Sequence, residues 1–167
     1  WSENFVKDRN VPGRTHRGAA FVAGSFGGFS SFTNVSFSRG TVFALSRFCS
    51  IVNFDHVSCN TDADFSAVEF RNSCSFVRAK FHSGASFRRS CFMGLVDFHE
   101  ASFGGDVSFR VAEFKKGARF EKIQNWGQDP SNWGRVFFDA TAYGSLSFEG
   151  SPLPPLGAFH GLKLENS

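Results

Sequence analysis

The histidines and cysteines are the side chains that could hold a metal or attack a substrate, and they follow no recognisable motif. The histidines are His16, His56, His82, His99 and His160. The cysteines are Cys49, Cys59, Cys74 and Cys91. The histidines have no metal-ligand spacing, the cysteines form no Cys-x-x-Cys pair, and the carboxylates are dispersed. We therefore expect no catalytic residues, no metal and no cofactor, and we expect the protein not to be an enzyme.

A large apolar residue recurs through the chain at spacings that alternate strictly between five and six residues. Between Phe21 and Phe120 this series has nineteen positions, of which eighteen hold Phe and one holds Cys59. The repeating unit is thus eleven residues long. Such a repeat predicts a stack of short units, none of which buries its apolar face alone.

The residue two places before each large apolar residue is small or slender, as at Ala63, Ala79, Ala101 and Ala112. In an extended segment, residues two apart lie on one face, while the residues between them face the other way. Spacings of five and six do not follow the 3.6-residue period of a helix. The pattern therefore predicts short strands that are interrupted by corners, around a narrow packed interior.

Individual units also resemble a known family. Ala-Asp-Phe-Ser-Ala (63–67), Ala-Lys-Phe-His-Ser (79–83), Ala-Ser-Phe-Gly-Gly (101–105) and Ala-Glu-Phe-Lys-Lys (112–116) resemble pentapeptide repeats of the Phe-centred branch. The resemblance implies an all-β fold, a right-handed quadrilateral parallel β-helix with four units to a coil. Because every second unit has a sixth residue, we expect about 22 residues per coil and roughly six coils.

This coil length predicts four interior columns of stacked rings. The expected structural core consists of Phe43, Phe48, Phe54, Phe65, Phe70, Phe76, Phe81, Phe87, Phe92, Phe98, Phe103, Phe109 and Phe114. Neighbouring coils of such a stack lie about 4.8 Å apart, which permits offset stacking of the rings. Cys59 and Cys74 should behave as small core residues. Cys49 and Cys91 should point outward, two coils apart and too far for a disulfide.

The chain divides into four predicted parts. Residues 1–20 form a basic N-terminal arm or cap, in which Trp1, Phe5 and Val6 either cover the first coil or belong to a disordered arm. Residues 21–120 form the regular β-helix, 121–136 an inserted loop, and 137–167 a last irregular coil and cap. If the insertion adds six residues, the inward positions resume at Phe137, Ala142, Phe148, Leu153, Phe159 and Leu164, with Tyr143 filling the space beside Ala142.

Two surfaces are candidates for binding. Trp126 and Trp133 in the inserted loop could form an exposed aromatic contact, or could pack onto the helix. The second candidate is a basic edge made by Arg71, Arg88, Arg89, Arg110, Lys115 and Lys116. The alternative for this edge is an ordinary solvated face in which the cations alternate with Glu69, Glu113 and Glu121.

These features favour a rigid protein-interaction scaffold with an unknown protein partner, and a homodimer through a terminal coil is a further expectation. Nucleic-acid or other polyanion binding through the basic edge is a less favoured alternative. Some members of the resembling family mimic DNA and bind type II topoisomerases, but that role needs a strongly acidic rod, whereas this chain has a formal net charge of +3. Unpaired cysteines and the lack of a signal peptide or membrane segment favour the cytoplasm.

Overall fold

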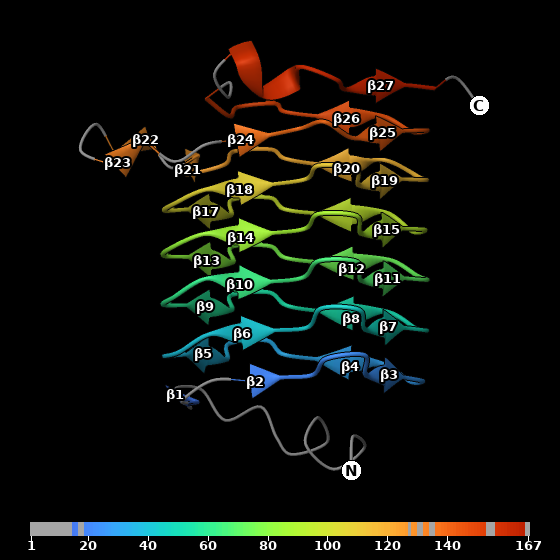
Figure 1. Cartoon of the computed structure of the whole chain (residues 1–167), viewed down its shortest axis with the longest axis vertical. Coiled ribbons are helices and arrows are strands. Elements are labelled where there is room, and N and C mark those ends of the chain that lie inside the picture. The colour runs from blue at the N-terminus through green and yellow to red at the C-terminus, as the bar shows by residue number, and fades with distance from the viewer. Residues whose placement is uncertain are drawn as a thin grey trace.

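A computed structural model of the chain describes residues 15–16, 19–126, 128–129, 132–133, 136–152 and 156–165. These residues form a parallel β-solenoid of about six turns, in which positions about 22 residues apart lie above one another (Figure 1). The strands pair into four parallel sheets, one for each side of the coil. The predicted fold class and coil length are therefore confirmed. The predicted cap residues Trp1, Phe5 and Val6 lie outside the described residues.

Each sheet contains one two-residue strand from every coil. Sheet A consists of β1 (Thr15–His16), β5 (Ser36–Phe37), β9 (Ser58–Cys59), β13 (Lys80–Phe81), β17 (Ser102–Phe103) and β21 (Asn125–Trp126). Sheet B consists of β2 (Ala19–Ala20), β6 (Thr41–Val42), β10 (Ala63–Asp64), β14 (Ala85–Ser86), β18 (Val107–Ser108) and β24 (Val136–Phe137). Sheet C consists of β3 (Ser25–Phe26), β7 (Arg47–Phe48), β11 (Glu69–Phe70), β15 (Cys91–Phe92), β19 (Glu113–Phe114), β25 (Thr141–Ala142) and β27 (Lys163–Leu164). Sheet D consists of β4 (Ser30–Ser31), β8 (Val52–Asn53), β12 (Cys74–Ser75), β16 (Val96–Asp97), β20 (Ala118–Arg119) and β26 (Leu146–Ser147).

The interior is filled by columns of aromatic rings. Within a column the rings lie nearly parallel, as for Phe76 and Phe98, whose centroids are 4.9 Å apart at an interplanar angle of 9°. Rings from facing columns meet edge to face, as for Phe87 and Phe98 at 5.3 Å and 81°. Both arrangements suit the quadrupole of the ring. All the expected core phenylalanines are at most 1% exposed, so the interior is a continuous apolar core.

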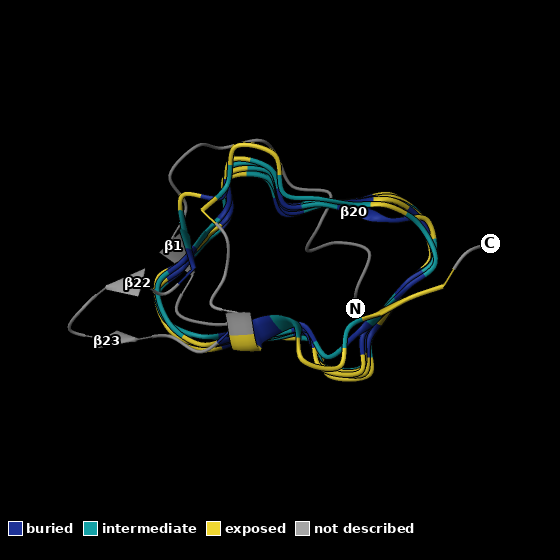
Figure 2. Cartoon of the chain, turned by 90° about the horizontal axis from the view of Figure 1, so that it is seen from above, coloured by how far each residue is buried: buried dark blue, intermediate teal, exposed yellow. Residues whose placement is uncertain are grey.

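Alternate corners of the coil are tight turns with a left-handed residue. In one such turn the Ser90 amide donates a hydrogen bond to the Phe87 carbonyl oxygen at 3.2 Å, and Arg89 between them has a φ of 60°. The residues with positive φ recur every eleven positions: Ala23, Asn34, Leu45, His56, Ala67, Arg78, Arg89, Glu100, Val111 and Lys122. The sixth residue of the longer units widens the other two corners. The coil thus keeps four sides, and its exposed residues gather at the corners (Figure 2).

The insertion after the fifth coil forms a small hairpin outside the stack. Its strands β22 (Gln128–Asp129) and β23 (Asn132–Trp133) pair antiparallel with each other and with no strand of the four parallel sheets (Figure 1). The chain then returns to sheet B at β24, which pairs with β18. The described hairpin therefore extends the corner without breaking the order of the coils.

The last coil departs from the predicted phase in two places. Phe138, rather than Phe137, continues the interior column and stacks on Phe109 at 4.9 Å. Phe137 lies instead under the Arg110 guanidinium, 5.2 Å from the ring centroid. Leu164 is in register with Ala142 but is 67% exposed. The predictions that Phe137 and Leu164 are inward core residues were therefore wrong.

Other positions of the last coil follow the prediction. Ala142 continues its column in register with Phe114. Phe148 continues its column by stacking on Phe120. Tyr143 does not fill the space beside Ala142, because its ring faces outward and lies 4.0 Å from the Lys115 ammonium. The 3-10 helix η1 (Leu156–Phe159) covers the end of sheet B, where the Ala158 carbonyl accepts a hydrogen bond from the Phe138 amide at 2.7 Å. Leu153 lies outside the described residues.

Candidate interaction surfaces

The cysteines of the described chain are all free thiols. Cys59 and Cys74 are buried, and burial raises the pKa of the Cys59 thiol to about 11, with a smaller opposing effect from the Thr41 hydroxyl. Burial also raises the pKa of Cys74. Because the thiolate is the reactive form, these two residues act as small core side chains. No group of three or more His, Cys, Asp or Glu among the described residues could hold a metal ion.

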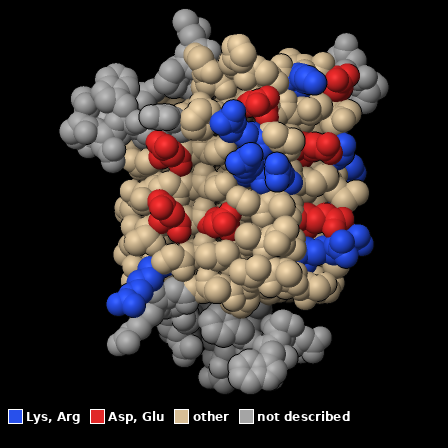
Figure 3. Space-filling view, viewed as in Figure 1, with Lys and Arg blue, Asp and Glu red and all other residues tan. Residues whose placement is uncertain are grey.

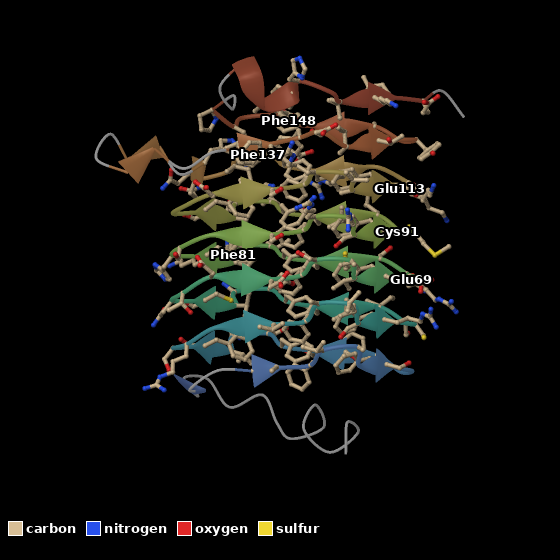
Figure 4. The ribbon with its side chains drawn as sticks, viewed as in Figure 1. Glu69, Phe81, Cys91, Glu113, Phe137 and Phe148 are labelled. Atoms are coloured by element: carbon tan, nitrogen blue, oxygen red, sulfur yellow. The ribbon has the colours of Figure 1, made fainter. Side chains whose placement is uncertain are left out.

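The outer face of sheet C carries ion pairs that bridge neighbouring coils. Glu69 accepts hydrogen bonds from Arg47 of the coil before and from Arg71 beside it, and these bonds lower the pKa of its carboxyl group, the Arg71 bond most. Two coils further on, Glu113 pairs with Lys115 at 2.7 Å. Glu69, Cys91 and Glu113 project from this face on successive coils (Figure 4).

A denser network of ion pairs and hydrogen bonds covers the outer face of sheet D. Arg119 contacts Asp97 at 2.9 Å and Glu121 at 2.7 Å, and the Ser147 hydroxyl donates to Glu121 at 2.8 Å. The Arg119 bond, followed by the Ser147 bond, lowers the pKa of Glu121 to about 2. Arg119 is thus matched by one carboxylate of the neighbouring coil and one of its own coil, so this face does not present a field of one sign.

Three arginines at the corner between sheets B and C differ from these paired charges. Arg88, Arg89 and Arg110 are exposed and form no ion pair with any residue that the structure describes. The Arg89 amide donates to the Arg110 carbonyl at 2.9 Å, so these residues lie on neighbouring coils. In the space-filling view, basic side chains gather near the centre of this face with acidic groups on both sides (Figure 3).

Exposed aliphatic side chains continue this corner along the stack. Leu45 and Val111 occupy the same left-handed turn position as Arg89, two coils before it and one coil after it. They are 63% and 59% exposed, and Val22 is 57% exposed near the start of the same corner. We call Val22, Leu45, Arg88, Arg89, Arg110 and Val111 the corner ridge. Its aliphatic members were missed by sequence reasoning, although Leu45 and Val111 hold the same position of the repeat and could have been found by it.

The remaining residues of the predicted basic edge lie elsewhere. Arg71 and Lys115 follow the strands of sheet C and are engaged with Glu69 and Glu113. Lys116 is exposed at the next corner, between sheets C and D, and forms no ion pair within the described chain. The six cations are thus divided between two corners, and the acidic residues of sheet C lie between them.

The two tryptophans do not form an exposed pair in the described structure. Trp126 is fully buried in the column of sheet A, where it stacks on Phe103 at 5.4 Å. Its indole nitrogen donates to the Pro152 carbonyl oxygen at 2.8 Å. The candidate role of Trp126 as a surface contact was therefore wrong, and the packing alternative applies. The side chain of Trp133 lies outside the described part of the structure.

A search for membrane-crossing helices among the described residues finds none that is both long and apolar enough. The comparisons with known proteins bear on the repeats. A family model described as pentapeptide repeats (9 copies) matches residues 66–113. No curated protein and no solved structure matches the chain significantly. The repeats in residues 66–113, with their five- and six-residue units and Phe-centred strands, are therefore similar to those of the pentapeptide repeat family.

Proposed function

We propose that this chain is a non-enzymatic, rigid scaffold that binds a protein partner through the corner ridge. The observation that carries this proposal is the combination, along one corner, of arginines without acidic partners and exposed aliphatic side chains. Arginine is enriched in protein interfaces, and the buried core of an interface is more apolar than its rim. The free cysteines suit a reducing compartment such as the cytoplasm.

The backbone beneath the ridge supports such a role. Each ridge residue belongs to a turn whose amides bond to the next coil, as when the Leu45 amide donates to Ser66 at 2.9 Å and the Ala67 amide donates to Arg88 at 2.8 Å. The turns also adjoin the stacked rings of sheet B. A surface held in this way is ordered before binding, so a partner would meet little cost of ordering it.

Polyanion binding is the second candidate, because Arg88, Arg89 and Arg110 form no ion pair in the described chain. Three arginines on two coils form a small footprint compared with the 6–10 phosphate contacts that strong nucleic-acid binding often uses. Leu45 and Val111 would gain little against a phosphate backbone. The combination thus favours a protein that presents acidic and apolar groups together.

The described surface offers little support for mimicry of DNA. Glu69, Glu100, Glu113 and Glu121 each pair with at least one basic side chain. An acidic rod requires carboxylates that remain without such partners over several coils. Topoisomerase binding by this mechanism is therefore the weakest of the alternatives.

The test compares variants that remove one component of the ridge at a time. Protein recovered by the immobilised chain would be quantified for the native protein, for the double variant Arg88→Ser/Arg110→Ser, for Leu45→Ser and for the control Lys116→Ser. The proposal expects one partner to be retained by Lys116→Ser and reduced at least tenfold by both ridge variants. Equal recovery by all four chains would contradict a role for the ridge.

A gel-shift titration with duplex DNA separates the two candidates. Polyanion binding would be lost in the arginine double variant, would weaken as salt increases, and would be unchanged in Leu45→Ser. A plasmid supercoiling reaction with DNA gyrase, run in parallel, tests the third alternative. Reduced supercoiling without a retarded plasmid band would indicate contact with the enzyme itself.

A second copy of this chain remains a candidate partner through a terminal coil. The last coil presents Leu164, which is largely exposed at the end of sheet C, and β27 has no further strand beyond it among the described residues. An unpaired strand edge with an exposed apolar residue favours association. Light scattering after gel filtration would show a dimer for the native chain and a monomer for Leu164→Glu.

A further inference from the structure

A groove lies at the corner between sheets D and A, which is opposite the corner ridge in the four-sided coil. Its volume is about 610 Å³, within the range of sites that bind small molecules. The lining residues that matter most are His56, Arg78, Lys80, His82, Glu100 and Ser102. His56, Arg78 and Glu100 occupy the left-handed turn position of three successive coils, and Lys80 and Ser102 project from β13 and β17. The strand β13 that carries Lys80 can be found in Figure 4 from the labelled Phe81.

The groove contains a cation without a counterion. Lys80 is in register with Ser58 on one side and Ser102 on the other, so no carboxylate lies above or below it in sheet A. It forms no ion pair with any described residue, unlike Lys115, which pairs with Glu113. Arg78 and Glu100 neutralise each other. Among the Lys, Arg and Glu side chains of the groove, the positive charge of Lys80 is therefore left unbalanced.

The other polar groups of the groove are suited to an oxyanion. The Lys80 ammonium has three N–H donors, and the guanidinium of Arg78 retains donors beyond the Nε–H that faces Glu100. The Ser102 hydroxyl forms no side-chain hydrogen bond in the described structure, and Ser102 lies next to Lys80 in register. His82 is fixed by a contact of 3.1 Å between its Nε2 and the Ser58 hydroxyl. Donors of several types thus converge on one side of the corner.

We propose that this groove binds a small organic anion, a phosphate monoester or a carboxylate attached to a polyhydroxy body. Lys80 contacts the anionic group, together with Ser102 and Arg78. The groove is larger than one anionic group requires, and the Glu100 carboxylate and the Gln124 side chain at its rim can bond to hydroxyl groups of the ligand. The groove and the corner ridge share no residue, so this site is independent of the proposed scaffold function.

Isothermal titration calorimetry of the full chain with three probes tests the proposal. The probes are ribose 5-phosphate, gluconate and ribose, which supply a phosphate, a carboxylate and no anion. We expect saturable binding of at least one anionic probe with a dissociation constant of about 1 mM or tighter, and no saturation with ribose. Comparison of the two anionic probes shows which anion the groove prefers.

The matched variants are Lys80→Ser and Lys116→Ser. Lys80→Ser copies the residue found above and below position 80, so the coil should fold normally, and it should weaken binding about tenfold or more. Lys116→Ser removes an exposed cation outside the groove and should leave binding unchanged. Equal weakening by both variants, undiminished binding to Lys80→Ser, saturation with ribose, or no saturation with either anion would each overturn the proposal.

Discussion

The regular coils between Phe21 and Phe120 and the last coil from Val136 onward have the same backbone pairing but different interiors. In the regular coils almost every inward-facing position of the repeat holds a stacked aromatic ring. In the last coil Ala142 follows Phe114, and Leu164, in register above it, is largely exposed. Yet the strand order continues, since the Glu165 amide still donates to the Ala142 carbonyl at 2.8 Å. Register is therefore maintained by the backbone ladder even where the ring column stops.

A hollow marks this difference in packing. It has a volume of about 700 Å³ and is bordered by Ala142, Leu146, Phe148, Leu162 and Leu164. The regular coils have aromatic rings in the equivalent interior positions, as where Phe92 stacks on Phe114 at 5.0 Å. The comparison teaches that the backbone hydrogen bonds of sheet C continue past the point where its ring column ends, while the other columns remain stacked. The two contributions can be separated by substitution.

The largest effect should come from removing a ring in the regular coils. Phe98→Ala should lower the free energy of unfolding by about 3–5 kcal/mol, because the ring is fully buried and stacks on both Phe76 and Phe120. Phe159→Ala in the last coil should cost only about 1–2 kcal/mol, because that ring is partly exposed. Urea denaturation measures both. Equal losses would mean that the two regions are packed alike.

A smaller effect is expected from a serine that links neighbouring coils. The buried Ser90 hydroxyl accepts a hydrogen bond from the Val68 amide at 3.3 Å and donates one to the Phe65 carbonyl at 2.6 Å. Ser90→Ala should therefore cost about 2 kcal/mol in the same denaturation experiment. Ser151→Ala should cost about 1 kcal/mol, because Ser151 makes the equivalent bonds to Ile123 and Phe120 in a less buried position. A larger loss for Ser151 would reverse the comparison.

Filling the hollow should bring the last coil closer to the regular ones. Ala142→Phe places a ring above Phe114 and should raise the free energy of unfolding by about 1 kcal/mol. The matched change Ala112→Phe in a regular coil should destabilise, since Ala112 is fully buried beside existing rings. The melting temperature should therefore rise for Ala142→Phe and fall for Ala112→Phe. Destabilisation by both would show that the hollow cannot accept a ring.

The smallest effect concerns Glu121, which joins the two regions through Arg119 and Ser147. The pKa of Glu121 is about 2 in the folded state, below the ordinary value of 4.5. Its contribution to the stability of the fold is therefore present above pH 4.5 and is lost as the pH falls toward 2. Glu121→Gln should therefore be less stable than the native chain at pH 7, and the difference should shrink below pH 4.5. Glu149→Gln serves as an exposed control. A difference that stays constant from pH 7 to pH 2 would contradict the ion-pair origin.

The regular coils could be predicted from the sequence because the spacing of Phe determines which residues face inward. The prediction lost its phase at Trp126 and Phe138. The interval from Phe120 to Trp126 is six residues where the alternation requires five, and a shift of one residue moves a strand side chain to the other face. Because Phe137 and Phe138 are equally apolar, spacing alone could not choose between them.

The surface was less predictable, although part of its order follows from the coil length. The pairs Arg47 with Glu69 and Asp97 with Arg119 are each 22 residues apart, and a search at that interval would have found them. The same interval relates Arg78 to Glu100 and Lys80 to Ser102, but it does not show that these turn residues and sheet A residues line one groove. Such sites arise from the shape of the corner, which the repeat pattern does not encode.

The hairpin of β22 and β23 has a practical consequence. It leaves the stack after Trp126 and returns at Val136, and the neighbouring coils remain paired on both sides of it. Because the flanking strands β21 and β24 pair with the preceding coil and not with the hairpin, we expect the flanking coils to keep their register when a foreign segment replaces it. The molecule can thus serve as a carrier that displays an inserted peptide at a fixed height along a rod.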